Sequence, residues 1–148
     1  MKTIAIGCDP GGIAAKEHLM EYMEAKGYGT CTDFGSDDPI YPRVALKVAE
    51  AVAEGEYDYG VLLGGTGLGV TITANKVKGA YAALLTDTFC AKRAKLSNNC
   101  NIACIGFKVI GTSLQEELID AFFLNEYVPG GSSQPKIDVY VDYDMNRK

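Results

Sequence analysis

The chain alternates between short, continuous apolar runs and longer segments whose apolar residues recur at helical spacing. The first run, residues 3–8 (TIAIGC), precedes residues 13–27, where Leu19 and Met23 are spaced as on one face of a helix. Gly27 stands where a glycine that ends a helix is expected. This stretch therefore predicts a strand followed by a helix.

The same unit repeats along the chain, and the strands are rich in Val, Ile, Leu and Ala. Further strands are predicted at 28–35, 59–65, 80–86 and 101–106, and further helices at 41–56, 67–79, 87–98 and 113–127. Five such strands alternating with helices are typical of an α/β fold with a parallel sheet covered on both faces. Right-handed crossovers then predict a doubly wound, three-layer α/β/α sandwich.

The segment after Tyr127 departs from this pattern. Residues 128–148 begin with turn residues and show no helical period. We therefore expect one domain over 1–127 and a C-terminal arm over 128–148. The arm either docks on a partner subunit or is a frayed terminus.

Composition excludes several function classes. With 148 residues, 47% apolar and 22% charged, the chain has the length and composition of one soluble domain. The net charge of -5, without a block of Lys or Arg, argues against nucleic-acid binding. The N-terminal apolar run is too short for a signal peptide or a membrane span. Five cysteines without a CxxC pair suggest a reducing cytoplasm and no zinc site.

A glycine-rich loop, residues 64–69 (GGTGLG), follows the third predicted strand. Ligands of open parallel sheets bind beyond the carboxyl ends of the strands. Glycines let backbone amides approach a ligand closely, and the following helix adds its positive dipole end. The loop is thus predicted to cradle a phosphate, a carboxylate or a reaction oxyanion. Tight packing of helix on strand is the structural alternative. The loop lacks GK[ST] and follows the wrong strand for a dinucleotide site.

Asp9 directly follows the first strand, at the same predicted edge of the sheet. Its carboxylate could accept hydrogen bonds from sugar hydroxyls or move a proton, or it could simply cap the next helix. The single histidine, His18, lies mid-helix beside Lys16 and Glu17 and is interpreted as a surface residue. No catalytic triad or metal cluster can be built around it.

Four motifs in order carry a family resemblance: IGCDPGG, YP at 41–42, LLGGTGLGVTITANKVKGAYAAL and NNCNIACIG. From Lys2 to about Tyr127 the chain resembles the ribose-5-phosphate isomerase B and galactose-6-phosphate isomerase family. The resemblance implies a Rossmann-like sandwich and interconversion of aldose and ketose sugars or sugar phosphates through a cis-enediolate, without metal or cofactor. It also implies homodimers or tetramers with active sites at the subunit interface, or a heteromer with a paralogue.

The resemblance also implies roles for individual residues. Asp9 and Thr66 match catalytic positions. The predicted substrate-binding residues are Tyr41, Gly65, Gly67, Leu68, Gly69, Asn75, Ser97, Asn98, Asn99 and Lys108. Ser132 and Lys136 fall where a partner subunit contributes to the site.

Several family positions are changed. Gly64 stands where the family has the cysteine base, Pro10 replaces a histidine that contacts phosphate, and Ser97 replaces the ring-opening histidine. Ser132 and Ser133 stand where arginine and histidine would bind phosphate, and Lys136 replaces a second arginine.

These changes leave alternatives open. Asp9 is the best candidate to replace the base, with Thr66 as a hydrogen-bond donor and the thiols of Cys8 and Cys90 as further candidates. The substrate is either an unphosphorylated sugar or a sugar phosphate held in another way. The alternative function is a non-catalytic sugar-binding or regulatory homologue.

Overall fold

The five predicted strands pair in parallel into one sheet with the order β2-β1-β3-β5-β4. A computed structural model describes all residues, 1–148. Its strands are β1 (Thr3–Cys8), β2 (Thr30–Gly35), β3 (Tyr59–Gly64), β4 (Ala82–Leu84) and β5 (Ile102–Gly106). The predicted α/β fold class is confirmed.

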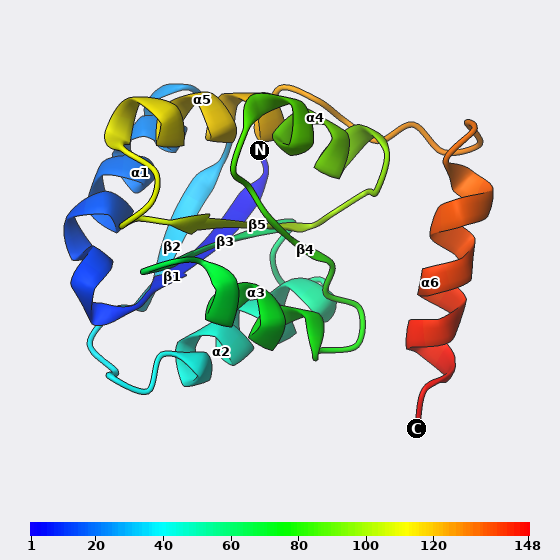
Figure 1. Ribbon diagram of the computed structural model, residues 1–148, viewed down its shortest axis with the longest axis horizontal. Coiled ribbons are helices and arrows are strands. Elements are labelled where there is room, and N and C mark those ends of the chain that lie inside the picture. The colour runs from blue at the N-terminus through cyan, green and yellow to red at the C-terminus, as the bar shows by residue number, and fades with distance from the viewer.

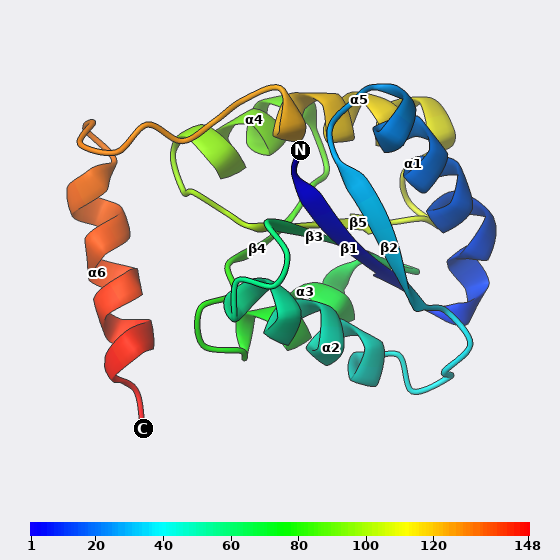
Figure 2. The same cartoon turned by 180° about the vertical axis from the view of Figure 1, so that it is seen from behind.

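Helices cover both faces of the sheet (Figure 1). One face carries α1 (Ile13–Ala25), α4 (Thr88–Leu96) and α5 (Thr112–Phe123); the other carries α2 (Pro42–Ala53) and α3 (Leu68–Asn75). A short 3₁₀ helix, η1 (Pro10–Gly12), precedes α1. The view from behind shows the same three layers (Figure 2). None of these helices combines the length and apolar character needed to cross a bilayer.

The alternation of side chains along each strand divides the core in two. Ile4 and Ile6 of β1 point to the α1, α4 and α5 layer, whereas Ala5 points to the α2 and α3 layer. All three are fully buried, as the strands of a sheet covered on both faces require. Gly27 ends α1 with a φ of +75°, as its place in the sequence predicts.

The short edge strand β4 is protected by a side chain instead of another strand. Asn75, the last residue of α3, donates from Nδ2 to the carbonyl of Ala82 (2.9 Å) and accepts from the amide of Ala82 at Oδ1 (2.9 Å). The amide group thereby replaces one hydrogen-bonded residue of a neighbouring strand. Such pairing shields an edge that would otherwise present free backbone groups.

Residues 128–148 show no helical period in the sequence, yet α6 (Gln134–Asn146) forms there, with a proline in its first turn. Helix α6 stands beside the β4 end of the sheet (Figures 1 and 2). Ile137, Tyr140 and Asp144 face the domain with helical spacing, but only Ile137 is both apolar and buried. Two of the three residues that recur at helical spacing thus contact the domain through polar groups. A search for apolar residues at helical spacing therefore does not detect this helix.

Lys95 of α4 is an almost fully buried cation, with 2% of its surface exposed. Its Nζ donates to the carbonyls of Asn125 (3.0 Å) and Phe122 (3.4 Å) at the C-terminal end of α5. The ammonium also lies 4.2 Å from the ring centroid of Tyr59. The carbonyls and the ring stabilise the charge, but burial outweighs them and lowers the pKa of Lys95 from 10.5 to about 8.

Lys95 should therefore change how stability depends on pH. Between its folded pKa of about 8 and its usual 10.5, the unfolded chain binds more protons than the folded one. The contribution of Lys95 to the free energy of unfolding consequently rises with pH in this window. In urea unfolding at pH 7 to 10, we expect wild type to gain stability relative to Lys95→Met as pH rises. Parallel curves for the two proteins would contradict this expectation.

Candidate functional site

The carboxyl edge of the sheet brings together the segments that follow β1, β3 and β5. The amide of Asp9 donates to the carbonyl of Leu63 (3.0 Å), and the amide of Lys108 donates to the carbonyl of Gly65 (3.0 Å). These bonds join the three segments side by side. Asp9, the glycine loop and Lys108 therefore form one cluster, as expected for the ligand edge of an open parallel sheet.

The amides of the glycine loop are largely unused within the protein. Those of Gly65, Thr66, Gly67 and Gly69 donate to no protein acceptor, and only the amide of Leu68 does so, to Thr66 Oγ1 (3.2 Å). Helix α3 also begins without a side-chain cap. A cradle of unpaired donors at a helix N-terminus is suited to hold a negatively charged oxygen.

The glycines of the loop differ in why they are needed. Gly67 has a φ of +82°, and a Cβ there would lie 2.6 Å from Leu84 Cδ1. A Cβ on Gly69 would overlap the hydroxyl of Tyr41, so the predicted binding residue Tyr41 covers the loop directly. Gly64 is different, because a Cβ there would meet its nearest atom at 3.5 Å, an ordinary contact. Backbone conformation and packing therefore require glycine at 67, a Cβ at 69 would displace the Tyr41 side chain, and position 64 leaves room for a Cβ.

Lys108 lies along the loop. A Cβ on Gly65 would be 3.5 Å from Lys108 Cδ, which places the stem of this lysine against the glycine backbone. Lys108 forms no ion pair within the protein. Its ammonium is the positive charge that the cluster offers to an anionic ligand.

Asp9 caps the next helix and also keeps one carboxylate oxygen without a partner in the protein. Its Oδ1 accepts a hydrogen bond from the amide of Gly11 (2.9 Å) and caps η1. Its Oδ2 has no hydrogen-bond partner in the protein, and the residue is only partly buried. The hydrogen bond to Oδ1 thus fixes the carboxylate, while Oδ2 remains available to accept a hydrogen bond or a proton from a ligand.

The two candidate thiols, Cys8 and Cys90, are poorly suited to act as a base. Cys8 is 2% exposed beneath Gly12, and burial raises its pKa to about 12. Cys90 is exposed, but its hydrogen bond with Asp87 raises its pKa. Both therefore remain protonated at neutral pH, and a thiol is a weak base.

Four predicted residues lie away from this cluster. Ser97, Asn98 and Asn99 follow α4 and precede β5, so they lie at the amino edge of the sheet. Asn75 is also at that edge, and both its amide hydrogens are used, by the carbonyls of Thr71 (3.1 Å) and Ala82 (2.9 Å). A single chain does not bring these residues next to Asp9.

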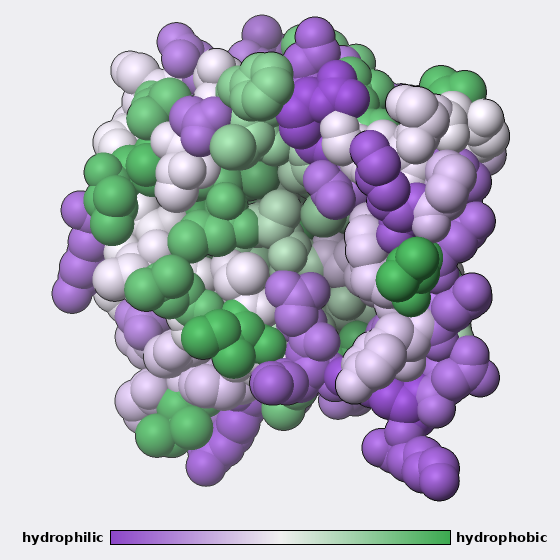
Figure 3. Space-filling model, turned by 45° about the vertical axis from the view of Figure 1, so that its right-hand side comes forward, coloured by the Kyte–Doolittle hydropathy of each residue, from purple (hydrophilic) through white to green (hydrophobic).

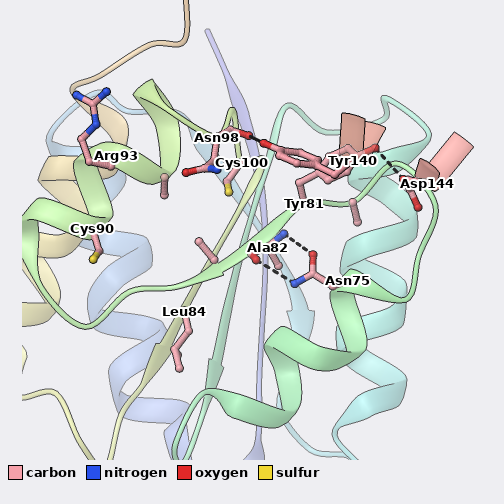
Figure 4. Close-up of a pocket in the computed structure, with 13 residues that line it drawn as sticks. Asn75, Tyr81, Ala82, Leu84, Cys90, Arg93, Asn98, Cys100, Tyr140 and Asp144 are labelled. Atoms are coloured by element: carbon pink, nitrogen blue, oxygen red, sulfur yellow. Dashed lines mark hydrogen bonds between the residues drawn. The ribbon is translucent and has the colours of Figure 1, made fainter. Parts of the chain in front are cut away.

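A cavity of about 550 Å³ runs along the edge strand β4, between α4 and α6, from Asn98 at the amino edge to Leu84 and the candidate thiol Cys90. Asn75 and Asn98 line it, and Figure 4 shows both beside the edge strand. Apart from Cys90, the other lining residues were not predicted from the sequence, and two of them, Tyr140 and Asp144, belong to α6, which the sequence did not reveal. The space-filling view shows a hollow with hydrophobic walls beside the more hydrophilic surface around α6 (Figure 3).

The two residues assigned to a partner subunit lie far along the chain from the cluster. Ser132 is exposed in the turn before α6, and Lys136 is exposed in the first turn of α6. Neither side chain forms a hydrogen bond or an ion pair within the protein. They are free to contact another molecule.

Comparison with known proteins places this geometry in a family. Residues 4–139 match the family model described as Ribose/Galactose Isomerase. A D-erythrulose-4-phosphate isomerase of Pectobacterium atrosepticum is 41% identical, with 100% of this chain and 99% of the relative covered. A ribose-5-P isomerase B of Listeria innocua is 40% identical, with 98% and 99% covered.

Comparison with solved structures gives the same family as the sequence comparison. The crystal structure of ribose-5-phosphate isomerase B from Mycoplasma genitalium, with bound ribulose-5-phosphate, superposes with a TM-score of 0.89 at 32% identity, covering 98% of this chain and 97% of that one. The match extends over the sheet, its helices and most of α6. The chain therefore belongs to the ribose/galactose isomerase family of enzymes.

Proposed function

We propose that the protein is an aldose-ketose isomerase that acts on a short-chain sugar phosphate through a cis-enediolate. The observation that carries the proposal is the set of unpaired loop amides beside the free carboxylate oxygen of Asp9. The relatives named above act, by their names, on phosphorylated sugars of four and five carbons. Their identity over the whole chain supports the same substrate class here.

In the proposed mechanism, Asp9 is the base that the family cysteine would otherwise supply. Its Oδ2 removes the proton from C2 of the open-chain aldose, and the electron pair shifts so that the carbonyl oxygen becomes an enediolate oxyanion. The proton of the C2 hydroxyl then passes to the oxyanion at O1, and Asp9 returns the proton it removed to C1, which gives the ketose with its carbonyl at C2. The substrate is neither oxidised nor reduced overall, and the base is regenerated.

The loop amides act on the charge that this step creates. The donors at Gly65, Thr66, Gly67 and Gly69 are already oriented before the oxyanion forms, so no reorganisation is needed. One such donor contributes about 3–4 kcal/mol in other enzymes. Thr66 Oγ1 accepts from the amide of Leu68, which leaves the hydroxyl proton available for a substrate oxygen.

Lys108 is the proposed partner of the substrate phosphate. It lies against the loop without an acidic partner, at the edge where Asp9 meets the substrate. A lysine offsets charge without fixing bidentate geometry, so it can serve phosphates at the end of chains of different length. This role compensates in part for Pro10, which stands where family members carry a histidine.

We further propose that a second copy of the chain completes the site. The loop opens to solvent, and Leu68 and Ile72 beside it are 55% and 61% exposed. Val139 on the outer face of α6 is 71% exposed. An apolar surface beside a polar site is typical of a subunit interface. A homodimer in which the arm docks on the partner would cover both surfaces.

The proposed homodimer also assigns a role to the predicted binding residues at the amino edge of the sheet. Residues 97–99, Ser132 and Lys136 cannot reach Asp9 of their own chain, but the corresponding residues of a partner can face it across a two-fold interface. A paralogue with the same fold could take the place of the second copy.

The second candidate function is a sugar-binding homologue without catalysis. The observation that favours it is the absence of an ionisable side chain at Gly64 and at Ser97. Such a protein would use the same amides and Lys108 to hold a sugar phosphate without moving a proton.

Exchange of the C2 hydrogen distinguishes the two functions. We expect wild type to introduce deuterium at C2 of erythrose 4-phosphate or ribose 5-phosphate in deuterated water, as followed by NMR. Asp9→Asn should lose about 100-fold or more of this rate, because the amide cannot take up the proton. Asp37→Asn, an exposed aspartate after β2, is the matched control and should behave as wild type. Ligand-dependent thermal stabilisation without exchange would instead indicate the binding protein.

Substitutions of Lys108 test whether this lysine binds the phosphate group of the substrate. Lys108→Met should lower kcat/KM for a phosphorylated sugar by about 10- to 100-fold, the value of a hydrogen bond to a charged group. Lys108→Arg should retain most of the activity. Steady-state kinetics with erythrose 4-phosphate and with free erythrose provide the comparison. Equal losses with both sugars would show that Lys108 does not contact the phosphate.

The loop glycines give a third prediction. Gly64→Cys should fold with an unchanged melting temperature and raise kcat, because a thiol beside a helix N-terminus ionises readily and adds a second base. Gly67→Ala should lose stability, by about 1–3 kcal/mol for the left-handed backbone alone. Thermal melts and turnover rates measure both. An unchanged kcat in Gly64→Cys would mean that position 64 does not face the reacting carbons.

A further inference from the structure

The turn formed by residues 97–99 is held in an unusual conformation at the end of α4. Asn99 has a φ of +50° and is the one non-glycine residue with a positive φ. Its amide donates to the carbonyl of Lys95 (3.1 Å), and Arg93 Nε donates to Ser97 Oγ (2.6 Å). These two contacts fix the ends of the turn but leave its centre, Asn98, without support from α4.

Helix α6 supplies the missing contact. Tyr140 Oη donates to the carbonyl of Asn98 at 2.6 Å, as Figure 4 shows. Burial raises the pKa of Tyr140, so the hydroxyl keeps the proton that it donates. The side-chain amide of Asn98 forms no hydrogen bond in the protein and lines the cavity. The backbone of Asn98 is thus fixed while its amide remains free for a ligand.

A second contact one turn later keeps α6 in register. Asp144 Oδ2 accepts from Tyr81 Oη (2.7 Å) and from the amide of Gly79 (2.8 Å). The rings of Tyr81 and Tyr140 pack with centroids 5.8 Å apart. Because α6 buries only Ile137 as an apolar side chain, these polar contacts determine where Tyr140 lies.

We infer that Tyr140 is a positioning residue, which holds the Asn98 turn so that the free amide of Asn98 can bind a hydroxyl of the substrate in the completed site. The inference rests on the proposed function for the identity of the ligand. The contact itself, between α6 and the turn, does not depend on it. Tyr140 touches no reacting atom, and its effect passes through Asn98.

A double-mutant cycle tests this coupling. Tyr140→Phe removes only the hydroxyl and should lower kcat/KM for erythrose 4-phosphate by about 2- to 10-fold, the value of one hydrogen bond. Tyr143→Phe on the same helix is the matched control, because Tyr143 is 77% exposed and its hydroxyl bonds to nothing in the protein. Tyr140→Phe combined with Asn98→Ala should lose no more activity than Asn98→Ala alone. Additive losses, or an equal loss in Tyr143→Phe, would overturn the inference.

Hydrogen exchange tests the contact without any substrate. The amides of Asn99 and Cys100 donate to the carbonyls of Lys95 and Ala94. In Tyr140→Phe their exchange should accelerate by about 2- to 10-fold while the melting temperature stays close to that of wild type. Unchanged exchange would overturn the positioning role. If wild type turns over no sugar but exchange accelerates as expected, the proposed function fails and the positioning of the turn stands.

Discussion

The site depends on the packing of the glycine turn against the end of β5. A Cβ on Gly106 would overlap the backbone of Thr66, and a Cβ on Gly67 would lie 2.9 Å from the amide of Gly106. Two glycines in contact thus allow the loop after β3 to lie directly on the neighbouring strand. Bonds from the amides of Phe107 and Lys108 to the carbonyls of Gly64 and Gly65 fix the loop there. Because its carbonyls are used inward, its amides are left to face outward.

This arrangement explains why the cradle does not depend on a side chain at position 64. The loop is held by backbone contacts at 64, 65 and 67, none of which needs a side chain. The position of the base and the geometry of the amides are therefore independent features of the chain.

Two buried lysines anchor the helices of one layer at opposite edges of the sheet. Lys16 of α1 is 3% exposed and donates to Asp33 (3.0 Å) and to Ser36 (2.7 Å) after β2, at the carboxyl edge. Lys95 of α4 bonds the end of α5 at the amino edge. A buried cation without partners would be costly, so these contacts also fix which segments lie beside each other.

The sequence by itself determined the elements and their order, because continuous apolar runs are the local signature of buried parallel strands. It also located the glycine loop and Asp9 at one edge, since the carboxyl ends of parallel strands meet there. It did not show that the side chain of Asn75 is hydrogen-bonded to the edge strand β4. It also did not show that residues 97–99 lie at the opposite edge of the sheet from Asp9. Nor did it reveal α6, which faces the domain with one buried apolar residue, Ile137, and with the polar side chains of Tyr140 and Asp144. The position of α6 depends on hydrogen bonds between residues more than 40 positions apart, Tyr140–Asn98 and Asp144–Tyr81, which only the tertiary structure brings together.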